Sequence, residues 1–137
     1  MTADAPVTPP AERGLLDTSV FVAREQGRPL GPLPAAAAIS VVTVAELHLG
    51  VLLADDPAVR AQRLRTLSSV EARFEPLPID AAVARTFAEL VAEARRTGRR
   101  PTIMDAWIAA TAVAHDLPVY TQDEDFLAIP RVRVVRV

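Results

Sequence analysis

The amino-acid sequence predicts one α/β domain in which helices cover both faces of a central parallel β-sheet. Short runs with β-strand character alternate along the chain with amphipathic helical stretches, an order typical of parallel sheets. The chain has 137 residues, half of them hydrophobic, which is enough to form one core without disulfides or a structural metal. It contains no internal repeat and no linker, so we expect the domain at residues 13–137, preceded by a flexible tail at residues 1–12.

The first part of the chain predicts two strands and two helices. A strand is expected at 13–16 and a short helix at 20–25. A loop rich in Gly and Pro follows at 27–34. A second strand at 37–40 then leads into a helix at 43–53.

The next helix has clear signals at its N-terminus. Asp56 is a favourable N-cap, and Pro57 is a favourable first helical residue. We expect this helix to run to about Arg73. The segment 74–79 contains two prolines, which cannot donate to a sheet ladder, so a strand there must be short or lie at an edge.

A long helix is expected from Ala81 to about Thr97, with Asp80 as its N-cap and Gly98 as its C-terminal stop. Apolar residues at helical spacing mark its buried face. They are Val83, Phe87, Leu90, Val91 and Ala94.

The last part of the chain predicts a buried helix and two strands. The helix at 103–115 is apolar on almost every side, as expected of a helix in the core. A strand follows at 118–121. The segment 132–137 alternates Val with Arg, the pattern of a half-exposed edge strand.

The composition excludes several classes of protein. There is no cysteine, which excludes disulfide scaffolds, thiol catalysis and thiolate zinc sites and fits a cytoplasmic protein. There is no lysine, which argues against P-loop NTPases and related phosphate-handling folds. The net charge of −2 gives no general attraction to nucleic acid. No apolar run approaches the ~18 residues of a membrane span, and the N-terminus lacks the apolar core of a secretory signal.

Four acidic residues are expected beyond the carboxyl ends of the strands, where open parallel sheets bind their ligands. They are Asp17 after the first strand, Glu46 one turn into the helix after the second, Asp105 at the start of the buried helix, and Asp123 after the third strand.

Each of these residues also has a purely structural explanation. The two aspartates that follow strands could cap a helix or form a turn. Thr43 and Glu46 have the S/T-x-x-E spacing of a capping box, and Thr102 with Asp105 fits the related S/T-x-x-D/E pattern. Taken together, however, neighbouring carboxylates would repel one another, and Asp105 adjoins an apolar stretch where an unpaired charge is costly. Divalent magnesium or manganese, which prefer oxygen ligands, would relieve that repulsion.

The four acidic segments resemble the four acidic motifs of PIN domains, in order and in separation. They are similar in particular to those of the VapC toxins of bacterial toxin–antitoxin pairs, at LDTS (16–19), VTVAELHLGV (42–51), DAWIAATA (105–112) and TQDEDF (121–126). The resemblance extends from about Gly14 to the C-terminus. One motif alone is weak evidence, but the ordered set is specific.

This resemblance implies a PIN fold with Asp17, Glu46, Asp105 and Asp123 around one or two Mg²⁺ or Mn²⁺ ions. It leaves open whether Asp123 or Asp125 is the fourth acidic ligand, because the last motif varies in length within the family. The resemblance also implies that Thr18 and Thr121 support ligands or water. The expected partners are RNA, a cognate VapB-type antitoxin that covers the site, and a second copy of the chain in a homodimer.

The expected activity is that of a metal-dependent endoribonuclease. A bound divalent ion lowers the pKa of its water and neutralises charge that develops on the phosphate, so no side-chain nucleophile is required. Asp17, Asp105 and Asp123 are the candidate ligands, whereas Glu46 is either a ligand or a residue that positions the attacking water. The resemblance implies products with a 5′-phosphate and a 3′-hydroxyl.

Two further features have alternative interpretations. The arginines 95, 96, 99 and 100 closely precede Asp105 and could guide an RNA backbone, although Arg95 and Arg96 could simply complement a helix C-terminus. Trp107 could stack on a base, but its apolar helix favours packing in the core.

The same residues allow two other functions. A metal-independent ribonuclease using His48 and His115 as acid and base is disfavoured, because His48 and Glu46 face different directions on a helix. The second rival is a catalytically silent PIN-like module that only binds RNA or protein, which the complete acidic set opposes.

Overall fold

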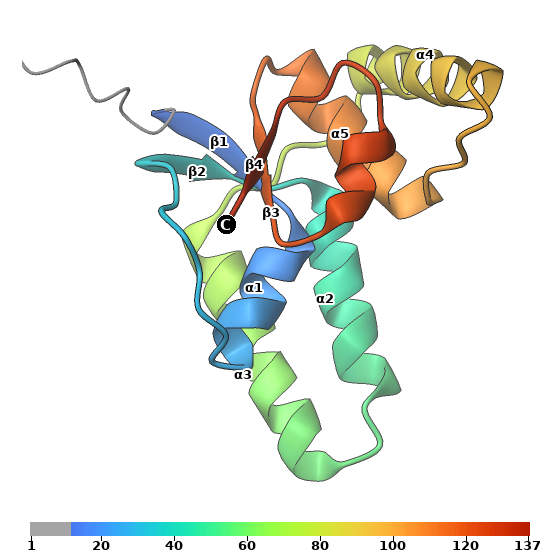
Figure 1. Ribbon diagram of the computed structural model, residues 1–137. Helices are drawn as coiled ribbons and strands as arrows, with labels where there is room; N and C mark the ends of the chain where they lie inside the picture. The colour runs from blue at the N-terminus through green and yellow to red at the C-terminus, as the bar shows by residue number, and fades with distance from the viewer. Residues whose placement is uncertain (1–11) are drawn as a thin grey trace, which may run out of the picture.

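The computed structural model describes residues 12–137 and has the predicted architecture, a parallel sheet with helices on both faces (Figure 1). Its strands are β1 (Arg13–Leu16), β2 (Ala36–Ala38), β3 (Val119–Thr121) and β4 (Val134–Arg136). They are ordered β2-β1-β3-β4, and every neighbouring pair is parallel. The carboxyl ends of the strands therefore meet at one edge of the sheet. The predicted tail lies outside the described residues, apart from Glu12.

Five α-helices and one short 3₁₀ helix connect the described strands. They are α1 (Thr18–Glu25), α2 (Val41–Leu53), α3 (Pro57–Arg73), α4 (Ala81–Arg96), α5 (Ile103–Ala114) and η1 (Glu124–Ala128).

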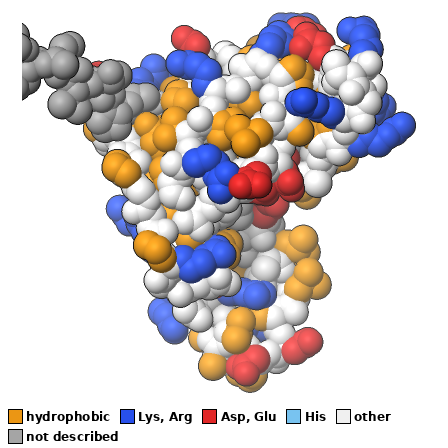
Figure 2. Space-filling view, viewed as in Figure 1, with side chains coloured by type: hydrophobic (Ala, Val, Ile, Leu, Met, Phe, Trp, Pro, Cys, Tyr) orange, Lys and Arg blue, Asp and Glu red, His pale blue; other side chains and the backbone are white. Residues whose placement is uncertain are grey.

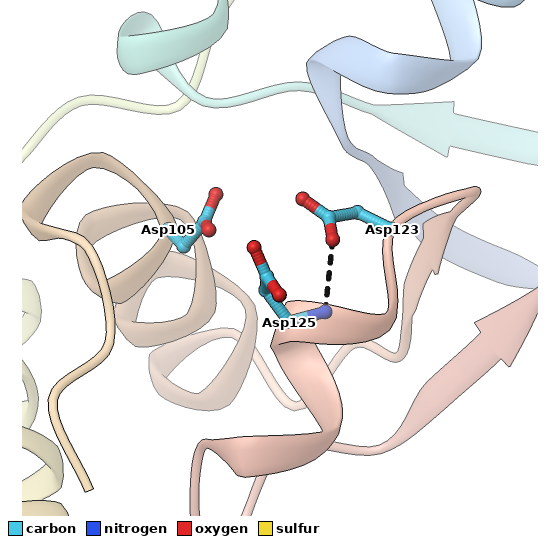
Figure 3. A group of neighbouring side chains, drawn as sticks. All are labelled: Asp105, Asp123 and Asp125. Carbon is cyan, nitrogen blue, oxygen red and sulfur yellow. Dashed lines mark hydrogen bonds between the residues drawn. The ribbon is translucent and has the colours of Figure 1, made fainter.

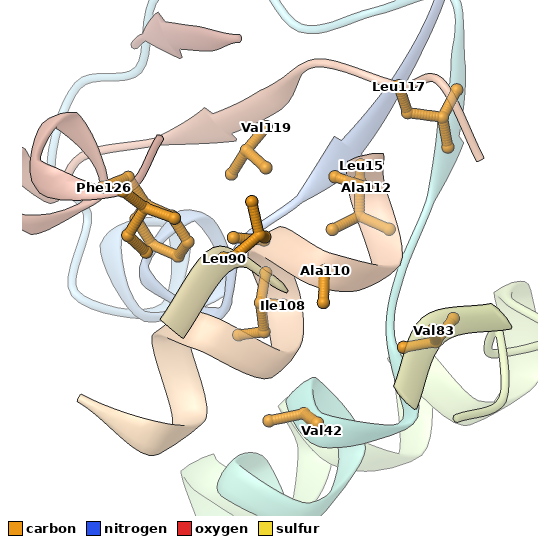
Figure 4. Packing of buried hydrophobic residues seen from close by; sticks show 12 residues of the cluster. Leu15, Val42, Val83, Leu90, Ile108, Ala110, Ala112, Leu117, Val119 and Phe126 are labelled. Carbon is orange, nitrogen blue, oxygen red and sulfur yellow. The ribbon is translucent and has the colours of Figure 1, made fainter. Parts of the chain in front are cut away.

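Each face of the sheet has its own hydrophobic core, because successive strand residues point to opposite faces. Leu15 and Val119 pack with residues of α4 and α5 (Figure 4). Leu16 and Tyr120, the next residues on the same strands, belong to a second cluster with residues of α1, α2 and α3. This arrangement confirms the prediction that helices cover both faces.

The region around β2 differs from the prediction. The strand ends at Ala38 rather than Ser40, and α2 begins at Val41 rather than Thr43 because the Ser40 side chain caps it by accepting from the Val42 N–H. The segment 74–79 forms no strand. Only Leu77 pairs, in an isolated bridge with Ser40. Its neighbours on both sides are prolines, which have no N–H to extend the pairing.

Helices α3 and α4 begin where the sequence predicts, after the N-caps Asp56 and Asp80. Gly98 has φ +77°, a left-handed conformation that suits the residue after a helix. Val83, Leu90 and Ala94 form the buried face of α4 as expected.

Helix α5 is the buried helix that the sequence predicts, with a continuous buried run from Ile108 to Ala112. The Trp107 ring stacks on Phe87 of α4, with ring centroids 3.8 Å apart and planes inclined by 14°, which favours packing over base recognition. No helix within residues 12–137 is both long enough and apolar enough to cross a membrane.

Candidate metal centre

Three aspartates converge beyond the carboxyl end of β3. Asp105 lies in the first turn of α5, Asp123 caps η1, and Asp125 lies in the first turn of η1. One carboxylate oxygen from each lies within 4.8 Å of the others, and the side chains point toward a common space (Figure 3). The structure therefore brings both alternatives for the fourth acidic position, Asp123 and Asp125, to the same place.

Asp17 enters the site from the end of β1. It is only 4% exposed, and its Oδ2 accepts a hydrogen bond of 2.9 Å from the Thr121 hydroxyl at the end of β3. The same oxygen accepts a longer bond of 3.4 Å from the Ser19 N–H, so Asp17 also caps α1. The structural explanation of this residue is thus correct but incomplete, because capping an exposed helix end does not require burial.

Glu46 reaches the site from α2, and its capping-box explanation is wrong. Ser40 is the N-cap of α2, which places Thr43 and Glu46 inside the helix. The Glu46 Oε1 accepts a hydrogen bond of 2.7 Å from the Thr18 hydroxyl, and that hydroxyl lies 3.0 Å from the Thr43 hydroxyl. Glu46 is held by tertiary contacts with α1 and not by its own helix end.

The electrostatics of the site couple four of these carboxylates. The pKa of Asp105 is raised to about 6, chiefly by burial and also by the charges of Asp17, Asp123 and Glu46, against an opposing effect of the Thr102 hydroxyl. Burial also raises the pKa of Asp17. Burial and the nearby Asp17 charge raise the pKa of Glu46. Without a bound cation, full ionisation of these carboxyl groups is therefore unfavourable.

Hydroxyl groups organise the carboxylates, and one of them, Ser19, is not predicted from the sequence. The Thr121 hydroxyl donates to Asp17 and accepts from the Asp123 N–H at 2.8 Å, so it links two acidic segments, as expected for a supporting residue. Ser19 was not singled out, yet its Oγ lies 3.2 Å from that hydroxyl and accepts from the Gln122 N–H at 3.0 Å. The only sequence signal for Ser19 is its place two residues after Asp17.

The charges of the site have no basic counterpart in the described part of the chain. Among residues 12–137, the ion pairs involve other carboxylates, namely Glu89, Glu93, Asp116 and Glu124. Thr102 does cap α5 by accepting from the Asp105 N–H at 3.2 Å, but a neutral hydroxyl does not compensate the charge of the Asp105 carboxylate.

The donor set fits a hard divalent cation. Oxygen atoms at about 2.0–2.6 Å from one ion lie at most about 4–5 Å from one another. The separation of up to 4.8 Å between the Asp105, Asp123 and Asp125 oxygens meets that limit. All of the donors are carboxylate oxygens, which suit magnesium, manganese or calcium better than softer metals.

The histidines do not form an alternative centre. His48 is exposed on α2. His115 caps the C-terminal end of α5, ten residues beyond Asp105, which corresponds to about 15 Å along the helix.

Comparison with known proteins agrees with this geometry. The PIN-domain family profile matches residues 14–132. The chain is 50% identical over 129 residues to ribonuclease VapC5 of Mycobacterium tuberculosis, covering 90% of this chain and 95% of that protein. It is 47% identical over 128 residues to ribonuclease VapC4 of the same organism, covering 91% and 97% respectively.

A solved structure supports the fold. The crystal structure of VapBC-5 from Mycobacterium tuberculosis, a member of the VapBC family of toxin–antitoxin systems, contains a chain that matches with a TM-score of 0.82 and 46% identity. The match covers 92% of this chain and 99% of that one. Sequence, fold and the convergence of acidic segments agree, and the chain belongs to the PIN-domain family, among its VapC ribonucleases.

Proposed function

We propose that this chain is the toxin of a VapBC pair, an endoribonuclease that hydrolyses RNA with the help of a divalent metal and is neutralised by a cognate antitoxin. The observation that carries the proposal is the convergence of the Asp105, Asp123 and Asp125 carboxylates, which have no basic partner among the described residues, in a chain half identical to a VapC ribonuclease. The charges of Asp17 and Glu46 also act on Asp105. Such a site is costly unless a cation binds it.

Within this proposal, Asp17, Asp105, Asp123 and Asp125 hold Mg²⁺ or Mn²⁺. When bound, the ion would lower the pKa of a coordinated water molecule and neutralise charge on the phosphate in the transition state. Thr18 occupies Oε1 of Glu46, which leaves the second oxygen of that carboxylate to position the attacking water. Thr121 fixes Asp17 and the backbone of Asp123 in one arrangement. The scissile bond breaks to leave a 5′-phosphate and a 3′-hydroxyl.

The antitoxin and the homodimer are parts of the same proposal. Carboxylates that lack a basic partner attract a cationic side chain from a protein that covers the site. For the dimer, the interval from Ala58 to Val91 offers exposed apolar side chains, among them Leu64 at 49% exposure. Analytical ultracentrifugation at micromolar concentration tests the dimer, and a monomer there would reject it.

The central experiment is cleavage of total cellular RNA by the purified chain with Mn²⁺, with Mg²⁺ and with EDTA, followed by mapping of new 5′ ends. We expect cleavage with either ion and none with EDTA. Cleavage that persists in EDTA would contradict the metal mechanism. Absence of cleavage with all ions, in a folded protein that binds RNA, would instead indicate the catalytically silent module.

Growth tests the toxin assignment. We expect expression of the chain alone to arrest growth and co-expression of the neighbouring antitoxin gene to restore it. The matched control is Asp55→Asn, which removes one exposed carboxylate outside the four acidic segments and should remain toxic. Unimpeded growth at confirmed soluble expression of the parent would contradict the assignment.

A further inference from the structure

We propose that an arginine-lined groove between the α4–α5 connection and η1 binds the phosphate backbone of single-stranded RNA and directs it to the acidic cluster. This inference rests on the proposed ribonuclease function and names the surface by which that site takes its substrate. We call this surface the arginine groove, formed by two adjoining hollows lined by Arg96, Thr97, Arg99, Arg100, Thr102 and Pro130 among others.

The arginine groove is continuous with the acidic cluster. Its inner hollow, of about 300 Å³, is lined by Arg99, Arg100 and Thr102 on one side and by Asp125 and Ala128 on the other. Its outer hollow, of about 460 Å³, shares Arg99 and Ala128 with the inner one. Since Asp125 lies within 4.8 Å of the Asp105 and Asp123 oxygens, a chain that follows the groove arrives at the metal site.

The basic side chains of the groove have no acidic partner within residues 12–137. The ion pairs of that region use Arg131, Arg133 and Arg136 instead. One acidic residue, Glu93, lines the outer hollow, but its Oε1 lies 3.6 Å from the Arg131 Nε, which compensates its charge. In Figure 2 several basic side chains lie over the α4 and α5 end of the molecule, where one acidic group also lies, and a second acidic group lies near the centre. The groove therefore presents positive charge to solvent.

Complementing the C-terminus of α4 can account for Arg95 and Arg96, which lie in its last turn, but not for Arg99 and Arg100, which lie beyond it. The terminal carbonyls of α4 are satisfied by the chain that follows: the Ala94 carbonyl accepts from the N–H groups of Thr97 and Arg99 at 3.1 and 2.8 Å, and the Arg95 carbonyl accepts from Gly98 at 3.0 Å. Among the described hydrogen bonds, no guanidinium donates to either of these carbonyls. The side chains of Arg99 and Arg100 remain available for a ligand.

RNA is the occupant that this chemistry selects. A metal site that cleaves phosphodiesters needs a neighbouring surface for the phosphates on either side of the scissile bond, although the chain as a whole has a net charge of −2. Arginine suits that task, because its planar guanidinium binds phosphate oxygens in a bidentate manner. The absence of lysine from the chain leaves arginine as its only permanently cationic side chain.

The test compares the double variant Arg99→Gln/Arg100→Gln with the matched control Arg95→Gln. Arg95 is exposed at the same end of α4 but lines neither hollow. For cleavage of a susceptible RNA, we expect the double variant to raise KM by about tenfold with kcat nearly unchanged, and to flatten the dependence of log KM on log salt by about 0.7 per lost phosphate contact. Arg95→Gln should change neither. Arg99→Lys/Arg100→Lys should restore most of the binding, since it keeps the charge.

A second readout does not depend on turnover. The same substitutions are placed in an Asp105→Asn background, and binding of a short fluorescein-labelled single-stranded RNA is followed by anisotropy. We expect binding to weaken in the double variant and to be kept in the control. If the parent fails to cleave RNA but this difference is found, the groove stands and the ribonuclease proposal fails. If the parent cleaves RNA, and the KM, salt dependence and RNA binding of the double variant match those of the Arg95→Gln control, the groove proposal is overturned. Loss of antitoxin binding with unchanged RNA binding would overturn it equally, by identifying a protein-docking surface.

Discussion

At the scale of single residues, the site depends on side chains that serve two purposes. Asp17, Asp105 and Asp123 each take part in a helix N-terminus, and each also contributes a carboxylate to one acidic cluster. A helix N-terminus favours negative charge, so the fold places these carboxylates where ionisation is least unfavourable. That contribution is small compared with burial and mutual repulsion, because the pKa of Asp105 still rises to about 6.

Asp105→Asn separates the metal-ligand role from the capping role. As a ligand, Asp105 is required for the ion, so we expect cleavage activity to fall by orders of magnitude while the fold survives. Without metal, the variant should melt slightly above the parent at neutral pH, because one charge leaves a crowded site. If Asp105 only supports the helix, the substitution costs a few tenths of a kcal/mol and leaves activity intact.

Cleavage of a susceptible RNA and the melting temperature with and without Mn²⁺ measure these effects, with Asp55→Asn as the control. A variant that cuts RNA at the parental rate and still gains stability from Mn²⁺ would remove Asp105 from the site.

The raised pKa of Asp105 predicts a pH dependence of the metal-free protein. Between the ordinary value of 3.8 and about 6, the folded state holds a proton that the unfolded state releases. The stability of the metal-free chain should therefore fall as pH rises through this window, because ionisation is more costly in the folded state. Thermal melts in EDTA at several pH values test this, and Asp105→Asn should flatten the curve there. An unchanged slope in the variant would contradict the assignment of the shift to Asp105.

At the scale of elements, the carboxyl ends of β1 and β3 are joined by the Thr121 hydroxyl, which is fully buried. Thr121→Val keeps the shape but removes the donor to Asp17 and the acceptor of the Asp123 N–H. We expect a loss of about 1–3 kcal/mol in the free energy of unfolding, together with weaker Mn²⁺ binding. Thr121→Ser should restore Mn²⁺ affinity, whereas a purely structural role would affect stability without changing that affinity. Isothermal titration with Mn²⁺ and urea unfolding measure the two effects.

Strand β1 makes a close approach that its sequence alone does not reveal. A Cβ at Gly14 would overlap the ring of Tyr120 on the neighbouring strand β3, and Tyr120 is itself 1% exposed. We expect Gly14→Ala to destabilise the protein by about 1–3 kcal/mol, the usual cost of overpacking. Gly27→Ala is an informative comparison, since a Cβ there meets no atom within 4 Å and the cost comes only from its φ of +69°. Urea unfolding that shows Gly14→Ala as stable as the parent would contradict the close approach.

Helix boundaries follow from the sequence where a strong capping signal marks them, whereas α1 and α2 each begin two residues before their predicted starts at 20 and 43. Asp56 with Pro57 and Asp80 are local signals, and α3 and α4 begin where these signals place them. The predictions for strand β2 and for the segment around Leu77 were less accurate, because strand pairing depends on residues far away in the chain. The site shows the same division: the acidic residues could be found from motifs, whereas the bond between Thr18 and Glu46, 28 residues apart, and the meeting of Asp123 with Asp125 at Asp105 require the tertiary structure.

At the scale of the whole molecule, the two cores on opposite faces of the sheet hold the helices that carry the site. Glu46 lies on α2, which packs mainly in the core with α1 and α3, whereas Asp105 lies on α5 in the other core. The sheet between them carries Asp17 and Asp123 at its carboxyl edge. The acidic site therefore joins elements from both sides of the sheet, and the cost of ionising its carboxylates lowers the stability of the entire domain.

Metal binding should for that reason stabilise the whole domain. An ion that binds only the folded state at about 100 times its Kd adds about 2.7 kcal/mol to the free energy of unfolding. For a domain of 137 residues we expect this to raise the melting temperature by roughly 8 °C. Mn²⁺ should produce the rise and EDTA should reverse it, as measured by differential scanning calorimetry at pH 7.

Lowering the pH below about 6 should reduce this rise in melting temperature, because protons then compete with the ion for Asp105. The control Asp55→Asn should keep the full effect. A melting temperature that does not respond to Mn²⁺ in the parent, at ion concentrations that support RNA cleavage, would show that the ion acts elsewhere than at this cluster.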